Sequence, residues 1–172
     1  METFQDLFEE ALRDIYYAEK AVLKVLPKMA KQASSEELAA AFTSHHEQTG
    51  QQVVRLERIF ERLGKTARGK KCPAIDGILE EGRELMKEAK NDTVRDAGML
   101  AAAQAVEHYE IARYGTLKAW AEKLGMPDAV ELLEETLKEE KATDEKLTDL
   151  AESEINLDAR GVEEALQKAG ER

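Results

Sequence analysis

Acidic side chains stand at positions of this chain where a helical pattern calls for apolar ones. Glu107 and Glu110 fall on the inward stripe of one amphipathic segment, among leucines, alanines and a tyrosine. Glu140 and Asp144 do the same in a second segment, and Glu19 interrupts a third. A buried carboxylate must be paired, protonated or bound to a cation, because an unpaired buried charge is costly. The inward faces carry too few cations to pair them all, so the pattern predicts two or more metal ions between four helices.

The types of donor atom indicate iron or manganese. Carboxylate oxygens suit hard cations, and an imidazole shifts the preference toward transition metals. Side chains three or four residues apart share a helix face, so both members of each acidic pair can reach one centre. The predicted metal ligands are Glu19, His45, Gln48, Glu107, Glu110, Glu140 and Asp144. The predicted hydrogen-bond partners of these ligands are Tyr16, Thr49, Gln52 and Tyr114.

Two long amphipathic segments form the first half of the chain. The first begins after Thr3, where Asp6 completes a weak capping box, and its apolar residues are spaced by three and four. The second opens with a capping box of Ser34 and Glu37, and Gly64 ends it. This pattern predicts a helical hairpin.

The second half repeats this plan after a long connection. We expect residues 64–91 to form a crossover with a short helix at about 75–90. Asn91 opens the third long helix, and a turn at residues 125–128 separates it from the fourth. Four helices with one long crossover have the connectivity of ferritin-like folds.

The predicted fold is therefore all-α, a ferritin-like four-helix bundle with a short extra helix between the second and third long helices. Residues 1–172 are expected to form a single domain, with the bundle at about 4–153. The polar segment at about 154–172 is expected to be a short C-terminal helix or a loose tail.

The polar positions of the four segments fall at one height. In an antiparallel hairpin, residues equally far from the turn lie level, at about 1.5 Å per residue. Glu19 precedes the first predicted turn by 15 residues, and Thr49 follows it by 15. Glu110 precedes the second predicted turn by 16 residues, and Glu140 follows it by 14. The pattern therefore predicts one polar layer roughly 22 Å from the turns, between apolar layers.

Composition and charge argue against several classes of function. A formal charge of −11 argues against nucleic acid, which requires a dense basic face, and against an anionic membrane surface. No apolar stretch approaches the roughly 18 residues of a membrane span, and the start lacks the pattern of a signal peptide. The single cysteine, Cys72, excludes a disulfide within the chain and fits a reducing compartment. The expected location is the cytoplasm.

Several short motifs carry a family resemblance. They are Asp14-Ile15-Tyr16-Tyr17-Ala18-Glu19; His45 with Thr49, Gln52 and Arg55-Leu56-Glu57; Cys72-Pro73-Ala74-Ile75 with Gly77; Ala103-Gln104-Ala105-Val106-Glu107-His108-Tyr109-Glu110; Tyr114-Gly115-Thr116-Leu117; and Glu139-Glu140-Lys141 with Thr143-Asp144. As a set they resemble the bacterial stress-associated YciE/YciF-like family of ferritin-like proteins, from Leu7 to about Ala151. The resemblance implies a ferritin-like bundle, a homodimer and a distant relation to rubrerythrin-type di-iron proteins.

The second helix departs from the usual di-metal pattern. That pattern places Glu-x-x-His on each of two helices, and no such spacing occurs at the expected height here. The second helix offers His45 and Gln48 instead, whereas the resemblance implies a carboxylate at the position of Gln48 in many relatives. An amide is a poorer ligand than a carboxylate, so one of two metal positions is expected to be weak or empty.

Two functions remain open from the sequence. The first is a di-metal carboxylate protein of the stress response that reacts with dioxygen or peroxide, as an oxidase, a peroxidase or an iron-handling protein. The second is a non-enzymatic, dimeric structural protein whose polar layer fixes the helix register. The residues also allow alternatives without a metal. An acidic helix can rotate its carboxylates into solvent, and His45 can be a core histidine whose nitrogens are hydrogen-bonded by other protein groups. Whether the chain is an enzyme stays open.

Overall fold

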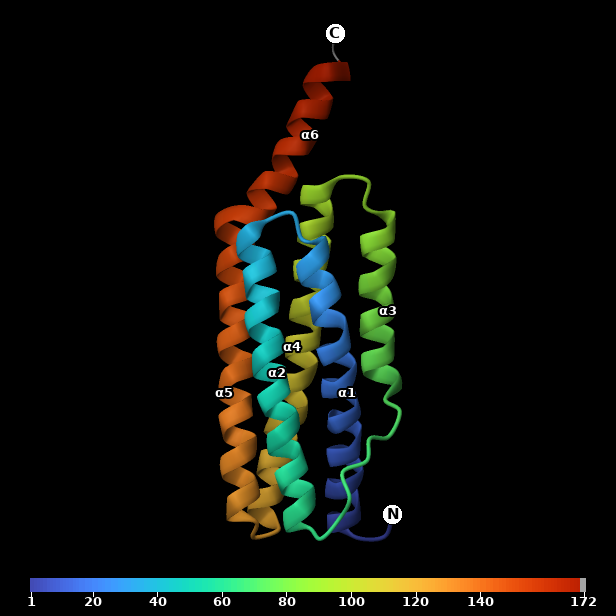
Figure 1. The fold of residues 1–172 in the computed structure, drawn as a ribbon, viewed down its shortest axis with the longest axis vertical. Helices are drawn as coiled ribbons and strands as arrows, with labels where there is room; N and C mark the ends of the chain where they lie inside the picture. The colour runs from blue at the N-terminus through green and yellow to red at the C-terminus, as the bar shows by residue number, and fades with distance from the viewer. Residues whose placement is uncertain (171–172) are drawn as a thin grey trace.

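The computed structural model describes residues 1–170, and every regular element in this range is a helix. The elements are α1 (Phe4–Gln32), α2 (Glu36–Arg62), α3 (Pro73–Glu88), α4 (Asp92–Lys123), α5 (Pro127–Leu150), the π-helix η1 (Ala151–Ile155) and α6 (Asn156–Gly170). Helices α1, α2, α4 and α5 run side by side as two hairpins (Figure 1). The predicted all-α bundle with one long crossover is confirmed.

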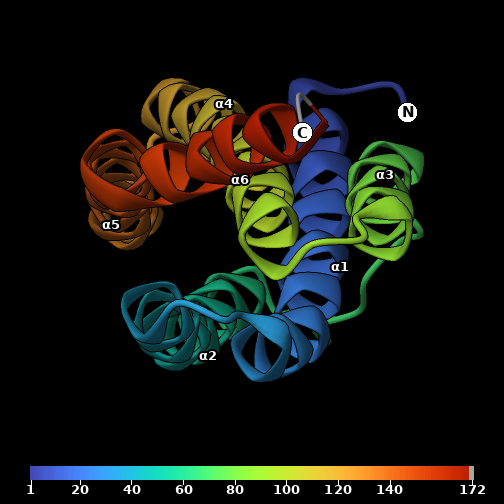
Figure 2. The same ribbon diagram turned by 90° about the horizontal axis from the view of Figure 1, so that it is seen from above.

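The crossover carries α3 along the outside of this bundle. Seen from above, α3 lies beside α1 and α4, away from α2 and α5 (Figure 2). Its approach to α4 is close at Gly82, where an added Cβ would come within 2.9 Å of the Cβ of Ala102. A larger residue at position 82 would therefore push the two helices apart.

The N-cap hydrogen bonds confirm the predicted cap of α1 and show that the predicted cap of α2 was wrong by one residue. The Thr3 hydroxyl accepts from the Asp6 amide at 3.0 Å, and the Asp6 carboxylate accepts from the Thr3 amide at 3.0 Å. The N-cap of α2 is Ser35 rather than Ser34, because the Ser35 hydroxyl accepts from the Leu38 amide at 3.2 Å. The physical reason is that Ser34 is held by another acceptor.

That acceptor is the carboxylate of Asp96, which the sequence pattern did not indicate. The Ser34 amide donates to both of its oxygens at 3.0 Å, and the Ser35 amide donates to one at 2.8 Å. The Ser34 hydroxyl adds a further hydrogen bond. Asp96 is only 1% exposed. The buried charge is thus satisfied by protein donors, and it ties the start of α4 to the α1–α2 turn.

Glycines end α2 and α4, as predicted. Gly64 and Gly125 adopt φ angles of 66° and 67°, in the left-handed region that favours glycine. Pro127 then starts α5. These stops set the lengths of the hairpins and so the height at which side chains of paired helices meet.

The core is apolar on both sides of a group of buried polar residues. Its largest fully buried apolar side chains include Phe8, Leu12, Ile15, Leu38, Phe42, Leu56, Ile59, Met99, Leu117 and Leu133. The buried polar group between the long helices comprises Glu19, His45, Thr49, Gln52, Glu107, Glu110, Thr136 and Glu140. Burial of these polar residues is costly, so the apolar packing on both sides must stabilise the bundle enough to offset it.

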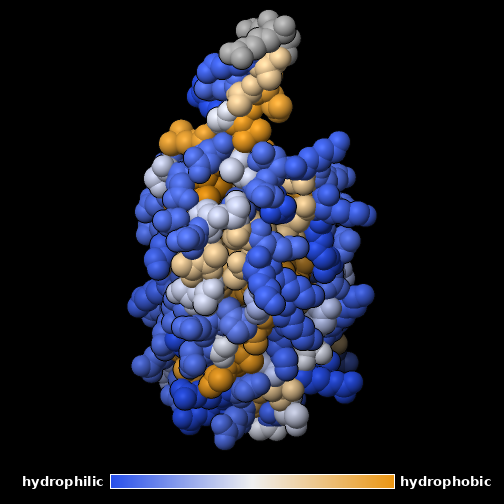
Figure 3. Space-filling model, turned by 45° about the horizontal axis from the view of Figure 1, so that its top comes forward, coloured by the Kyte–Doolittle hydropathy of each residue, from blue (hydrophilic) through white to orange (hydrophobic). Residues whose placement is uncertain are grey.

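The C-terminal segment continues α5 through the five-residue π-helix η1 into α6, which projects beyond the bundle (Figure 1). Hydrophobic residues gather near the base of this projection, on a surface that is otherwise mostly hydrophilic (Figure 3). Leu157 and Leu166 of α6 are 60% and 69% exposed. The predicted polar segment is therefore helical as far as Gly170, and residues 171–172 lie outside the described range. Within residues 1–170, no helix is long and apolar enough to cross a membrane.

We expect Asp96→Ala to lower the free energy of unfolding by about 1–3 kcal/mol, because the amides of Ser34 and Ser35 lose their hydrogen bonds to a buried, charged acceptor. Asp149→Ala, at an exposed position of α5, is the matched control and should stay within about 0.5 kcal/mol of the wild type. Urea unfolding measures both. Equal stability of the two variants would show that the α1–α2 turn does not depend on this carboxylate.

Candidate metal centre

Four buried side chains from three helices converge at the centre of the bundle. They are His45 of α2, Glu107 and Glu110 of α4, and Glu140 of α5. Each offers one ligand atom, and these atoms all lie within 4.8 Å of one another. His45 stands between two helices, since its Nδ1 lies 3.0 Å from Glu107 Oε1 and its Nε2 lies 3.9 Å from Glu140 Oε2.

The helical repeat explains why these carboxyl groups are inside. Glu107 and Glu110 are three residues apart on the face of α4 that also carries Ala103 and Leu117. When that apolar stripe packs into the core, the two carboxyl groups are buried with it. The alternative of rotation into solvent does not occur, because it would expose the stripe.

Helix α1 adds a fifth carboxyl group. Glu19 is fully buried, and the hydroxyl of Tyr114 on α4 donates a hydrogen bond to its Oε1. Its other oxygen has no partner among the described residues. Glu19 lies outside the group of atoms within 4.8 Å, but it means that all four long helices direct an acidic or imidazole group into this region.

Most acceptor atoms of the centre lack a hydrogen-bond donor among the described residues. They are both carboxyl oxygens of Glu110 and Glu140, Oε2 of Glu19 and Glu107, and Nε2 of His45. Asp96 provides a contrast, since its carboxylate is equally buried but receives hydrogen bonds from both serines of the α1–α2 turn. Unpaired buried acceptors are costly, so the residues present fit a site whose missing partner is a cation.

Burial raises the pKa of the four fully buried glutamates of this region, Glu19, Glu107, Glu110 and Glu140. The pKa of Glu19 rises from 4.5 to about 8, first through burial and then through the charge of Glu140, while the Tyr114 hydroxyl lowers it. Burial likewise raises the pKa of Glu107 to about 8 and that of Glu110 well above its usual value. A cation bound here would therefore displace protons, and its affinity would increase with pH.

Two other predicted ligands lie apart from the converging atoms. Gln48 is half-buried, and its amide oxygen accepts from the Thr143 hydroxyl of α5 at 3.4 Å. The side chain of Asp144 is 21% exposed and contacts Gln104 and His108 of α4, each at 3.4 Å. The structure therefore brings together His45 and the glutamates, while these two residues lie at the helix interfaces beside them.

Of the four residues predicted to hydrogen-bond the metal ligands, some contact the centre and others contact groups outside it. Tyr114 reaches a glutamate of the centre, as described above, whereas Tyr16 donates to Glu57 at 2.8 Å instead. The Thr49 hydroxyl donates to the backbone carbonyl of His45, one turn earlier on α2, at 2.9 Å. Gln52 donates to Glu139 of α5 at 3.1 Å.

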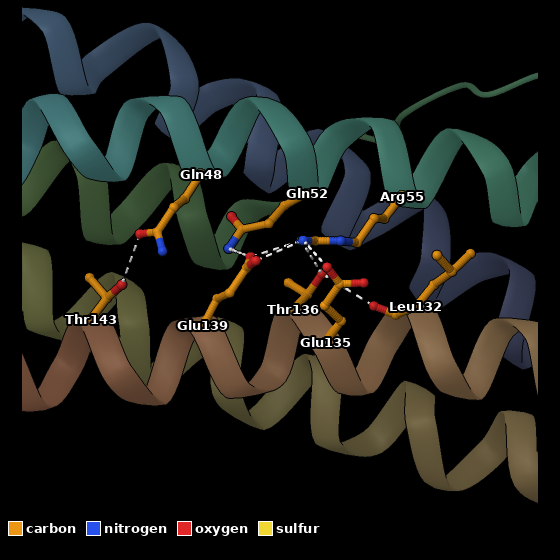
Figure 4. A network of polar contacts seen from close by, with 8 residues as sticks. All are labelled: Gln48, Gln52, Arg55, Leu132, Glu135, Thr136, Glu139 and Thr143. Carbon is orange, nitrogen blue, oxygen red and sulfur yellow. Dashed lines mark hydrogen bonds and ion pairs between the residues drawn. The ribbon is translucent and has the colours of Figure 1, made fainter.

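A polar network between α2 and α5 borders the centre, and Arg55 is its main donor (Figure 4). Its two terminal nitrogens donate to the two oxygens of Glu139 at 2.8 and 2.7 Å, and one also reaches Glu135 at 2.6 Å. A forked contact of this kind is strong and directional. Because Glu139 faces Arg55, the next residue, Glu140, turns into the core. Glu139 and Glu140 are adjacent in the sequence, and adjacent residues of a helix do not share a face. The sequence therefore indicated that one of the two would face the core and the other a neighbouring helix or solvent.

Residues 3–160 match the model of a protein family described as a domain of unknown function, DUF892. The chain belongs to the DUF892 family. The chain is also 46% identical over 157 residues to protein YciF of Escherichia coli (strain K12), an alignment that covers 91% of this chain and 95% of YciF. The predicted YciF-like relationship is therefore confirmed.

Solved structures of this fold extend the comparison. The crystal structure of the E. coli stress protein YciF is similar with a TM-score of 0.86 at 46% identity, covering 91% of this chain and 99% of that one. YcfI from Rhodopseudomonas palustris, named as a candidate structural protein, has a TM-score of 0.84 at 52% identity over 86% of this chain and 94% of its own. A protein from Xanthomonas campestris pv. campestris, 22% identical with a TM-score of 0.73, shares the fold.

The raised pKa values predict that the metal-free protein loses stability as the pH increases. Glu19 and Glu107 hold their protons up to about pH 8 in the folded state, but only to about 4.5 in the unfolded chain. Folding therefore takes up protons between these values, and the stability present below about pH 4.5 is lost as the pH rises through about 8.

Replacing one carboxyl group by an amide should remove part of this dependence. We expect Glu107→Gln to unfold at a higher urea concentration than the wild type at about pH 8, and at a similar concentration at about pH 5. Glu47→Gln, at an exposed position of α2, is the control and should follow the wild type at both values. Parallel pH profiles for all three proteins, measured with a chelator, would contradict the raised pKa of Glu107.

Proposed function

We propose that this DUF892 protein binds iron or manganese inside the bundle and serves the bacterial stress response through that centre. His45, Glu107, Glu110 and Glu140 would hold the metal, and Glu19 would add a carboxylate from α1. One observation carries the proposal: buried ligand atoms from three helices lie within 4.8 Å of one another, and most have no other partner in the described part of the chain.

The chemistry of the donors supports these two metals. Three carboxyl groups and one imidazole favour a transition metal that accepts oxygen ligands, rather than a calcium site built from oxygen alone. A structural zinc site would normally use cysteine. The only cysteine, Cys72, lies elsewhere, with its Sγ 3.1 Å from the Tyr109 hydroxyl.

The surrounding residues would orient the ligands and keep water away. A bound iron or manganese ion would supply electron transfer with a small oxidant, dioxygen or peroxide. The Tyr114 hydroxyl would hold Glu19 in place. If Glu107 bound a metal, it would give up its 3.0 Å contact with His45 Nδ1. The carboxyl protons would leave as the metal enters, because a ligand must be deprotonated.

A structural role is the second candidate, and the raised pKa values favour it. Carboxyl groups that keep their protons can share them with one another and with His45, and a polar layer of this kind can fix helix register without a metal. This role would agree with the name given to YcfI. The predicted homodimer would suit either function and stays a prediction. The small oxidant also stays a prediction, and so does the expectation that the protein binds neither nucleic acid nor membranes.

Metal uptake separates the two functions. We expect untagged protein, treated with a chelator and then offered Fe(II) or Mn(II) without oxygen, to retain between about one and two equivalents by elemental mass spectrometry. The variant Glu107→Gln/Glu140→Gln should retain almost none, because it replaces a carboxyl ligand by an amide on each of two facing helices. The control Glu47→Gln/Glu145→Gln changes exposed positions of α2 and α5 and should bind as the wild type does. No uptake by the wild type, together with a more stable double variant, would leave the structural role.

Restoring a carboxylate on α2 tests whether one metal position is weak. Gln48 lies one turn after His45 on the same helix, and among the described residues its amide oxygen has only the Thr143 hydroxyl as partner, at 3.4 Å. We expect Gln48→Glu to raise the metal content toward about two equivalents, or to tighten binding of a second ion, since a carboxylate is the better ligand. Glu at an exposed position of α2, as in Gln51→Glu, should leave the stoichiometry unchanged. Identical titrations of wild type and Gln48→Glu would show that this position is not part of the site.

A further inference from the structure

A small apolar cavity adjoins the candidate centre on the side of the crossover helix. It has a volume of about 30 Å³ and is bounded by α1, α3 and α4, with His45 contributed by α2. His45 and Glu107 line it, and they are also members of the candidate centre. The rest of its wall is apolar, with Val22, Leu26 and Val106 among the buried residues.

The size of the cavity limits what it can hold. Holding one water requires roughly 10–15 Å³ of such space. The volume of about 30 Å³ therefore accommodates a molecule of roughly two heavy atoms. A larger organic substrate does not fit without displacing core side chains, which close packing resists.

The outer wall of the cavity is shared with a groove on the protein surface. Val25 and Met86 also line a groove on the surface between α1 and α3, and both side chains are only half-buried. Lys28, Arg83 and Lys87 line the same groove. A positively charged entrance disfavours a metal cation, so this side of the bundle suits an uncharged molecule.

The wall also discriminates between uncharged oxidants. Water and hydrogen peroxide could form hydrogen bonds only at the inner end, with His45 and Glu107, and would give them up along the rest of the wall, which carries no other polar side chain. Dioxygen forms no strong hydrogen bonds in water and loses none. Apolar cavities are known to bind small apolar molecules and to stay dry.

We propose that this cavity is a binding site for dioxygen, entered between α1 and α3 and ending at His45 and Glu107. Its use as a source of oxidant rests on the proposed metal centre, but the binding of dioxygen itself does not. The crossover helix then has a role beyond connection, because Ile78, Leu79 and Met86 of α3 supply the wall that α1 and α4 leave open.

Paramagnetic relaxation by dioxygen tests the site in metal-free protein. The full chain, with labelled methyl groups and a chelator present, would be compared under dioxygen and under nitrogen by NMR. We expect the largest enhancement at the buried methyl groups of Val22, Leu26 and Val106, and a smaller one at Val54 and Val94, which are 40% and 42% exposed. Enhancement that simply follows exposure would overturn the proposal.

Two variants narrow the cavity from opposite ends. Val25→Phe enlarges a half-buried side chain at the entrance, and Ala103→Leu enlarges a buried one deep in the wall. We expect both to abolish the enhancement at Val106, while the control Val54→Phe, on the exposed face of α2, keeps it. If Ala103→Leu fails to fold, Val25→Phe still decides. Persistence of the signal in a folded Val25→Phe protein would overturn the route, whereas failure of the metal centre would show only in the uptake measurement.

Discussion

Acidic side chains held in an apolar interior are the constraint on which this structure depends. Four glutamates and one histidine at the centre of the core come from all four long helices, and most of their acceptor atoms have no protein donor in the described residues. Such an arrangement persists only if the surrounding contacts outweigh its cost or if a cation removes that cost. The apolar layers on both sides supply the first condition, because no helix can turn its carboxyl group to solvent without exposing its own apolar stripe.

Three polar contacts, two of them outside the centre and one at Glu19, keep the helices in register. Asp96 joins α4 to the α1–α2 turn, Tyr114 joins α4 to α1 through Glu19, and Arg55 joins α2 to α5 through Glu139. At Asp96 and in the pair of Arg55 with Glu139, the carboxylate oxygens all receive hydrogen bonds, whereas Oε2 of Glu19 has no partner among the described residues. Most of the unpaired buried atoms in the described chain belong to His45 and the glutamates of the centre, which makes these atoms the more informative feature.

The two sides of the centre differ in chemistry. Toward the outside of the α4–α5 hairpin lie polar groups, where Asp144 contacts His108 and Gln104. Toward the crossover lies an apolar wall to which α3 contributes. This asymmetry would allow separate routes for a charged ligand and an uncharged one, and it would give the long crossover of this DUF892 protein a function in the proposed site. The similarity to YciF over most of both chains shows that the helical fold itself is shared.

Local chemistry in the sequence was sufficient to predict the helices, their glycine stops, the crossover and the inward placement of Glu19, Glu107, Glu110 and Glu140, because periodicity and caps act within a few residues. It was not sufficient for Asp144, Gln48 and Tyr16. Their positions depend on the rotation of each helix by a fraction of a turn, and α5 is rotated by the contact of Glu139 with Arg55, a residue 84 positions away. The same holds for Asp96, which displaced the predicted cap from Ser34 to Ser35. Sequence thus determined which groups face inward, and tertiary packing alone decided which of them meet, since that depends on contacts between distant segments.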